Sequence, residues 1–121
     1  HAASIHGYNA PLKLFVQSWP HVGLSDTTPM GRWVSDSAAG MTAIVAGQKT
    51  WNGVVSQGPD AIRGKSDGAF LKTILEYAEE RGLSTGVVSN MTITDATPGA
   101  CFAHVNDRRM WGEIFLQLMN P

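Results

Sequence analysis

Three groups of polar residues in this sequence carry side chains that could do chemistry. The first, Asp36-Ser37, directly precedes a run of small and apolar residues that is typical of a buried helix. A serine at a helix N-terminus lies where backbone N–H groups and the helix dipole stabilise an anion, so Ser37 is a candidate nucleophile. The alternative is a plain helix cap, with the small residues Ala38 and Ala39 only allowing close packing.

The other two groups flank a second predicted helix. Asp95 and Thr97, in the segment TITDATP, place two hard oxygen donors in one loop, which suits a hard cation. The segment HVNDRR (104–109) contains Arg108 and Arg109, and a guanidinium matches two phosphate oxygens. In the alternative reading, Asp95 is a capping loop residue and Arg108 is a solvated surface charge.

Composition and motifs argue against several classes of function. The 121 residues carry a net charge of −1, which provides no basic field for nucleic acid or an anionic membrane surface. No apolar run approaches the roughly 18 residues of a membrane helix. The segment DSA lacks the G-x-S-x-G elbow of the α/β-hydrolases, which argues against a Ser-His-Asp esterase, and no His and Cys residues have structural zinc spacing. We interpret His104 as a core histidine and Cys101 as a buried, inert thiol.

Hydrophobic periodicity predicts the elements that must position these groups. Helices are expected at 37–46 with Gly47 as the stop, at 67–82 behind an Asp67 cap, from Pro98 to about Val105, and at about 109–119. Their expected inward residues are Ala38, Met41, Ile44 and Val45, then Phe70, Leu71, Ile74, Leu75 and Ala78, and in the last helix Trp111, Ile114, Phe115 and Leu118.

Between these helices the sequence predicts strands and a turn. Short strands are expected at 21–26 and 83–90, and Asn52-Gly53 predicts a hairpin or tight turn. Strands that alternate with helices predict an α/β fold with a parallel sheet in a single domain. In such a fold the Asp36-Ser37 and TITDATP groups would lie outside the carboxyl ends of the strands, where ligands gather.

Two longer segments resemble the alkaline phosphatase family. VSDSAAGMTAIVAGQKTWNG (34–53) resembles its nucleophile segment, in which D-S-A is followed by small residues, T-A and G-x-K. GVVSNMTITDATPGACFAHVNDR (86–108) resembles the family's next strand, loop and helix, including D-A-T-P, A-H-V and the arginine that follows. The likeness runs from about Pro20 to about Met119 and so covers most of the chain.

The resemblance implies a role for each site residue. Ser37 would be phosphorylated as a nucleophile stabilised by zinc, and Asp36 would orient Arg108, which would bind two phosphate oxygens. Thr97 would bind magnesium, and Asp95 would reach the same ion, as in the magnesium-dependent bacterial type. The small residues after Ser37 would let the helix start approach the metals and phosphate.

The resemblance also implies that most of the metal cage lies elsewhere. Family members are several times longer, so the remaining zinc and magnesium ligands are expected outside residues 1–121. The four histidines do not match family ligand positions: His1, His6, His21 and His104. We therefore expect this segment alone to be inert and to need the remainder of a parent chain.

For the complete protein, the resemblance implies a three-layer α/β sandwich with a mostly parallel sheet, of which 1–121 is one segment of the catalytic domain. It also implies a periplasmic or secreted homodimer that hydrolyses phosphomonoesters, releases inorganic phosphate, and has no nucleic acid or membrane partner. The alternatives are a non-catalytic oxyanion-binding module, which uses Ser37 and Arg108 without metals, and an inactive fragment.

Overall fold

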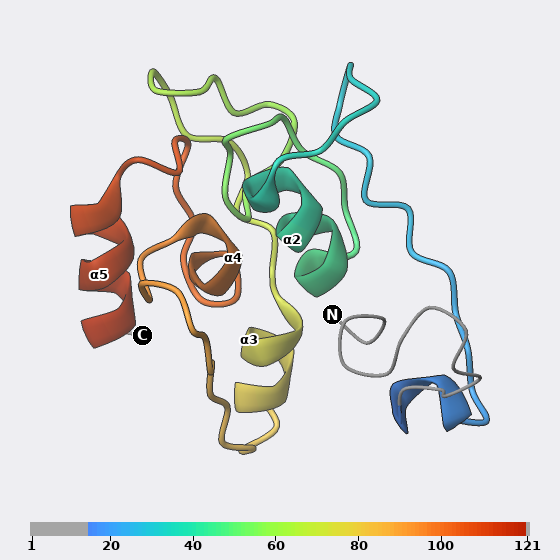
Figure 1. Ribbon diagram of the computed structural model, residues 1–121. Coiled ribbons are helices and arrows are strands. Elements are labelled where there is room, and N and C mark those ends of the chain that lie inside the picture. The colour runs from blue at the N-terminus through green and yellow to red at the C-terminus, as the bar shows by residue number, and fades with distance from the viewer. Residues whose placement is uncertain (1–14, 121) are drawn as a thin grey trace.

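The computed structural model describes residues 15–120 of the chain. Its elements are the 3-10 helix η1 (Phe15–Ser18) and the α-helices α2 (Ser37–Ala46), α3 (Ile74–Glu79), α4 (Ala96–Gly99) and α5 (Trp111–Met119). Helix α2 packs against both α4 and α3, and α5 lies on the other side of α4 (Figure 1). Long loops connect these helices. Within residues 15–120, no helix has the length and apolar character needed to cross a membrane.

Helix α2 begins and ends where the sequence predicts. Asp36 caps its N-terminus, because the Asp36 Oδ1 atom accepts the Ala39 N–H at 3.0 Å. Gly47 ends the helix in the left-handed region, with φ of 67°, and donates its N–H to the Ala43 carbonyl. Both termini are thus specified by residues that lie next to the helix in the sequence.

The buried face of α2 differs in part from the prediction. Ala38 and Val45 are buried as expected, but Thr42 is also buried and Ile44 is exposed. The Thr42 hydroxyl donates to the Ala38 carbonyl at 2.8 Å and accepts the Ser56 N–H at 2.9 Å. This bonding satisfies a polar group in the core and turns Ile44 outward, which periodicity of apolar residues alone could not show.

Helix α3 is shorter at both ends than the helix predicted from Asp67. Its start is set by a capping box, in which the Thr73 hydroxyl accepts the Glu76 N–H and the Glu76 carboxylate accepts the Thr73 N–H. Asp67 does not cap a helix, because its Oδ1 atom accepts hydrogen bonds from the side chains of Gln57 and Asn106. The predicted start was therefore wrong: long-range contacts engage Asp67.

The residues just before α3 form an extended segment. Phe70 makes an antiparallel bridge with Gln57, and the Leu71 N–H donates to the Ser56 carbonyl at 3.0 Å. Leu71 is buried as predicted, whereas Phe70 and Ile74 are exposed. The backbone pairing of this segment with residues 56 and 57 outweighs its helical periodicity.

Helix α4 also differs from the prediction, since it spans Ala96–Gly99 and does not run from Pro98 to Val105. Val105 pairs in an antiparallel bridge with Val55, through hydrogen bonds of 2.9 and 3.0 Å. A Cβ at Gly99 would lie 3.2 Å from Ile114 Cγ2, so this glycine allows α4 to pack closely against α5. Because Val105 pairs with Val55, which lies 50 residues earlier in the same chain, the helix cannot extend to Val105.

Backbone pairing within residues 15–120 is limited to isolated bridges. All three are antiparallel: Val55–Val105, Gln57–Phe70 and Ile62–Ser66. The predicted strands at 21–26 and 83–90 are extended segments without strand partners in this part of the chain, and Val22, Leu24 and Val88 project into solvent. An extended sequence becomes a strand only when a neighbour satisfies its N–H and C=O groups, so the parallel sheet is not formed among the described residues.

The core is built mainly from small residues of α2, α4 and the adjoining turns. Its buried members are Ala38, Val55, Ala96, Ala100, Ala103, Val105 and Ile114. Short side chains let the helices approach closely. In α5, Ile114 is buried as predicted, but Trp111 and Phe115 are exposed. The prediction that these two aromatic residues point inward is wrong for the described chain.

His104 is a structural core residue, as the sequence indicates. Its Nδ1 atom lies 2.7 Å from the Ser56 carbonyl, its Nε2 lies 3.1 Å from Glu76 Oε1, and its ring stacks on Phe70 with centroids 4.9 Å apart. Burial raises the pKa of Glu76, but hydrogen bonds from Thr73 and His104 outweigh it, and the pKa of this carboxyl is lowered overall. These contacts tie α3 to the segment after α4.

Candidate active site

Ser37 is the first residue of α2, and its side chain is exposed. Asp36 precedes it at the cap position and uses only Oδ1 to bond the helix, through the Ala39 N–H. The second carboxylate oxygen, Oδ2, is therefore available to another partner. A helix start with an exposed hydroxyl is a favourable place for an anion, because the helix dipole and the first N–H groups are oriented toward it.

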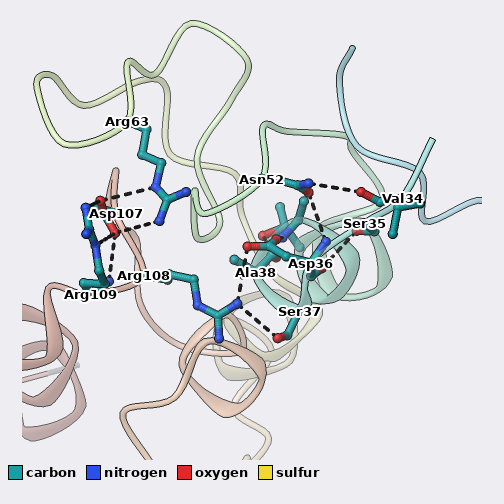
Figure 2. A network of polar contacts seen from close by, with 12 residues as sticks. Val34, Ser35, Asp36, Ser37, Ala38, Asn52, Arg63, Asp107, Arg108 and Arg109 are labelled. Atoms are coloured by element: carbon teal, nitrogen blue, oxygen red, sulfur yellow. Dashed lines mark hydrogen bonds and ion pairs between the residues drawn. The ribbon is translucent and has the colours of Figure 1, made fainter. Parts of the chain in front are cut away.

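Asn52 holds the peptide that leads into this helix start. Its Oδ1 atom accepts the Asp36 N–H at 3.0 Å, and its Nδ2 donates to the Val34 carbonyl at 3.0 Å (Figure 2). Asn52 lies in the tight turn that the sequence predicts, closed by the Val54 N–H donating to the Trp51 carbonyl at 3.0 Å. The turn thereby sets the position of Asp36 and of the serine after it.

Arg108 joins this helix start from the opposite end of the chain. Its backbone N–H donates to the Gly53 carbonyl at 2.7 Å, and its Nη1 atom lies 3.3 Å from Asp36 Oδ2 and 3.2 Å from Ser37 Oγ (Figure 2). Within residues 15–120, no protein acceptor bonds its Nε or Nη2 atoms. The guanidinium is thus oriented by one nitrogen and keeps donors for two oxygens of a bound anion.

Asp107 forms a second charged network directly beside Arg108. Its buried carboxylate accepts from Arg63 Nε at 3.2 Å, from Arg109 Nε at 3.2 Å and from Arg109 Nη2 at 2.8 Å. Hydrogen bonds from Arg109, with further help from Arg63, hold the pKa of Asp107 well below its usual range although burial opposes this. Arg63 also lies over Gly53, where a Cβ would be 2.3 Å from Arg63 Cζ.

The two networks together favour an anion. Three guanidinium groups (Arg63, Arg108 and Arg109) accompany two carboxylates (Asp36 and Asp107) at this end of the molecule. The carboxylates orient the guanidinium groups without neutralising all of their charge. An oxyanion that reaches Ser37 would therefore meet both hydrogen-bond donors and excess positive charge.

Asp95 and Thr97 lie at the start of α4, apart from these contacts. Asp95 occupies the cap position without a side-chain cap bond, and the Thr97 side chain is exposed. Within residues 15–120, no hydrogen bond or ion pair joins either residue to Ser37 or Arg108. No group of three or more potential metal-binding side chains occurs in this described range. Their free oxygens are hard donors of the kind that magnesium prefers.

Sequence reasoning singled out Ser37, Asp36 and Arg108, which the structure brings together, but missed the residues that hold them. Asn52 was identified only as a turn residue, and Asp107 and Arg63 were not singled out. Asn in an Asn-Gly turn carries side-chain donors and acceptors, which could have indicated a bridging role. The link between Arg63 and Asp107 spans 44 residues and left no local signal.

The other predicted residues stay outside the site. Cys101 is buried, burial raises the pKa of its thiol, and its Sγ donates to the Thr97 carbonyl, which supports the reading as an inert thiol. His1 and His6 lie outside the described residues.

An exposed serine hydroxyl, a guanidinium with free donors and a helix start define a site suited to an oxyanion such as phosphate. The family comparison agrees with this class: residues 4–118 match the model of the alkaline phosphatase family. The chain therefore belongs to the alkaline phosphatase family, which confirms the resemblance seen in the sequence.

Relatives and solved structures of known proteins support the same family. The chain is 39% identical over 105 residues to alkaline phosphatase 4 of Drosophila melanogaster, covering 85% of this chain and 17% of that protein. It is 43% identical over 94 residues to alkaline phosphatase of Escherichia coli K12, covering 78% of this chain and 18% of that protein. It is 45% identical over 80 residues to streptomycin-6-phosphate phosphatase of Streptomyces griseus, covering 66% of this chain and 16% of that protein. The chain thus spans less than a fifth of the length of these relatives.

Solved structures show the same fold. A histidine-to-aspartate mutant of the TAB5 alkaline phosphatase, described with Mg bound in its M3 site, matches with a TM-score of 0.80 at 29% identity, over 98% of this chain and 32% of that one. A cold-active alkaline phosphatase from Shewanella sp. matches with a TM-score of 0.72 at 32% identity, over 82% of this chain and 24% of that one. The fold of this chain is therefore alkaline-phosphatase-like.

Proposed function

We propose that this chain supplies the nucleophile and the phosphate-binding arginine of an alkaline phosphatase that hydrolyses phosphomonoesters as part of a longer polypeptide. The observation that carries the proposal is the contact of Arg108 Nη1 with both Asp36 Oδ2 and Ser37 Oγ. Membership of the family supports it. Asp36 acts as a positioning residue, since it touches the guanidinium and the helix and leaves the serine hydroxyl free.

The proposed reaction has two displacement steps at phosphorus. The Arg108 guanidinium binds two non-bridging oxygens, and Ser37 Oγ transfers its proton to solvent water as it attacks phosphorus. The ester P–O bond breaks, its electron pair goes to the leaving oxygen, and that oxygen takes a proton. Water then attacks the phosphoserine, the P–Oγ bond breaks, Ser37 regains a proton and inorganic phosphate leaves. The helix dipole of α2 stabilises the negative charge throughout.

Zinc and magnesium are the proposed cofactors. Asp95 and Thr97 would hold magnesium, because both present side-chain oxygens that no protein group in residues 15–120 engages. Ser37 would present its Oγ to zinc, and the other ligands would come from outside this chain. A metal bound next to a hydroxyl lowers the pKa of that hydroxyl and so makes a nucleophile available at neutral pH.

The complete protein is proposed to be a periplasmic or secreted homodimer with a three-layer sandwich around a mostly parallel sheet. Family membership and the similarity to solved alkaline phosphatases support this proposal. In it, the exposed apolar segments 21–26 and 83–90 would gain strand partners from the remainder of the polypeptide.

The phosphorylated residue tests the proposal directly. The complete enzyme is incubated with a labelled phosphomonoester, quenched at acidic pH and digested, and the labelled peptide is identified by mass spectrometry. We expect the phosphate on Ser37 and nearly complete loss of turnover in Ser37→Ala. Ser35→Ala is the matched control, because Ser35 only donates to the Asp36 carbonyl. Label on any other residue would contradict the assignment.

A further inference from the structure

The two segments that carry the candidate site meet at the turn 51–54. On one side, Asn52 in this turn accepts the Asp36 N–H at 3.0 Å and so sets the start of α2. On the other side, the Gly53 carbonyl accepts the Arg108 N–H at 2.7 Å. A residue that holds this turn against the segment before Arg108 would therefore set where the guanidinium lies relative to the start of α2.

Arg63 contacts both the turn and that segment. Its Nε and Nη2 atoms donate to Oδ2 and Oδ1 of Asp107 at 3.2 and 3.4 Å, so the guanidinium pairs through two hydrogen bonds with the residue directly before Arg108 (Figure 2). The same guanidinium lies against Gly53, because a Cβ on this glycine would overlap the Cζ, Nε and Nη1 atoms of Arg63. Arg63 thus bridges the turn and the segment that carries the proposed phosphate-binding arginine.

The loop that carries Arg63 is itself held to the same segment. Asn106 Oδ1 accepts the Gly64 N–H at 3.0 Å, and the antiparallel bridge Ile62–Ser66 closes the loop. The side chain of Asp107 is only 6% exposed, so water competes weakly for its pair with Arg63. All of these contacts join described residues of this chain. The arrangement is therefore formed without the remainder of the polypeptide.

From these contacts we infer that Arg63 is a positioning residue: through Asp107 and Gly53 it fixes the backbone from which the Arg108 side chain reaches Ser37. Arg63 acts through Arg108 and does not itself bind the phosphoryl group. A shift of this backbone would misalign the guanidinium with two phosphate oxygens, and a bidentate contact depends on that alignment. The inference rests on the proposed function, because it takes Arg108 to bind the phosphoryl oxygens.

A double-mutant cycle on the complete enzyme tests this role, with inorganic phosphate as the probe. The inhibition constant of phosphate is measured for the wild type, Arg63→Met, Arg108→Ala and the double variant. We expect Arg63→Met to raise this constant about three- to tenfold in the wild-type background. In the Arg108→Ala background the change should stay below about twofold, because no guanidinium remains to be positioned. A direct attraction between Arg63 and phosphate, or a general loss of structure, would act equally in both backgrounds.

Two further variants separate positioning from charge and from folding. Lys65→Met removes a positive charge from the same loop and leaves both contacts of Arg63 in place, so it should keep the wild-type inhibition constant. Arg63→Lys keeps the charge but lacks the planar guanidinium, so it should lose most of the same phosphate affinity with a melting temperature close to that of the wild type. If Arg63→Met does not fold, the cycle is measured with Arg63→Lys in its place.

The outcomes distinguish this inference from the proposed function. If Arg108→Ala weakens phosphate inhibition and the Arg63 variants do not, the positioning role is overturned and the proposed function stands. An equal loss in both backgrounds, or an equal loss in Lys65→Met, would also overturn the role, since Arg63 would then act through folding or charge. If Arg108→Ala keeps the wild-type inhibition constant, Arg108 does not bind phosphate, and the proposed function fails together with this inference.

Discussion

Arg108 Nη1 lies 3.2 Å from Ser37 Oγ, although 71 residues separate the two in the sequence. The same nitrogen lies 3.3 Å from Asp36 Oδ2, so a carboxylate next to the serine holds the guanidinium beside the hydroxyl. A guanidinium held by a carboxylate loses little conformational freedom when it binds an oxyanion, which favours tight recognition.

Replacing Arg108 should weaken phosphate binding without unfolding the protein. A bidentate charge-assisted contact contributes about 1.5–3 kcal/mol, so Arg108→Ala should raise the inhibition constant of inorganic phosphate about ten- to a hundredfold. The melting temperature should change little, because the side chain is partly exposed. Inhibition kinetics and thermal melting measure the two effects. If Arg109→Ala weakens inhibition and Arg108→Ala does not, the phosphate contact belongs to Arg109.

Removing the Asn52 side chain should displace Ser37, the proposed nucleophile. Asn52→Ala deletes the bonds to the Asp36 N–H and the Val34 carbonyl, which together set the entry into α2. At about 1 kcal/mol for each bond, we expect kcat to fall roughly five- to thirtyfold. KM should change much less if the loss is one of positioning. Asn90→Ala, in an exposed loop, is the matched control. An equal loss in both variants would argue against a positioning role.

Asp107 should stabilise the fold in a pH-dependent way. Its folded-state pKa is lowered, so its contribution is complete above the ordinary aspartate pKa of about 3.9 and is lost as the pH falls through the folded value. Asp107→Asn should therefore lower the unfolding midpoint of the complete protein at neutral pH, by the equivalent of about 1–3 kcal/mol. The gap between variant and wild type should narrow below about pH 4.

Unfolding measured across pH, with Glu113→Gln as an exposed-carboxylate control on α5, checks this prediction. A gap that stays constant from pH 7 to pH 3 would show that the variant acts through packing and not through the charge of Asp107.

Thr97 should affect magnesium dependence and leave substrate binding intact. Thr97→Val removes one hydroxyl at nearly constant volume, so magnesium affinity should fall, and excess magnesium should restore part of the activity by mass action. Direct titration of magnesium by calorimetry gives a readout independent of turnover. Thr94→Val, in the same loop, serves as the control. Wild-type magnesium affinity in Thr97→Val would show that Thr97 does not bind magnesium. Thr97 would then be a surface residue and Asp95 only a helix-capping residue.

Much of the candidate site could be predicted because its signals are local. Asp36 as a cap, Gly47 as a helix stop and the Asn52-Gly53 turn each depend on neighbours within a few residues, and the structure confirms all three. The resemblance of segments 34–53 and 86–108 likewise predicted the family, which the family comparison confirms.

Errors arose where distant contacts decided the local conformation. Asp67 bonds Gln57 and Asn106 and caps nothing, and Val105 leaves the helix to pair with Val55. Neither partner is visible in a window of neighbouring residues. The strands predicted at 21–26 and 83–90 are extended, but pairing requires a neighbour that residues 15–120 do not provide.

The sequence by itself thus determined the family, the helix that presents Ser37, and the residue types at the site. Tertiary structure alone decided that Arg108 meets Asp36 and Ser37, that Asp107 gathers Arg63 and Arg109, and that Asn52 supports the helix start. The physical reason is the range of the interactions. Caps and turns form between residues that are already close in the chain. The ion pair of Arg108 with Asp36 across 72 residues and its hydrogen bond to Ser37 across 71 exist only when α2 and α4 are packed together.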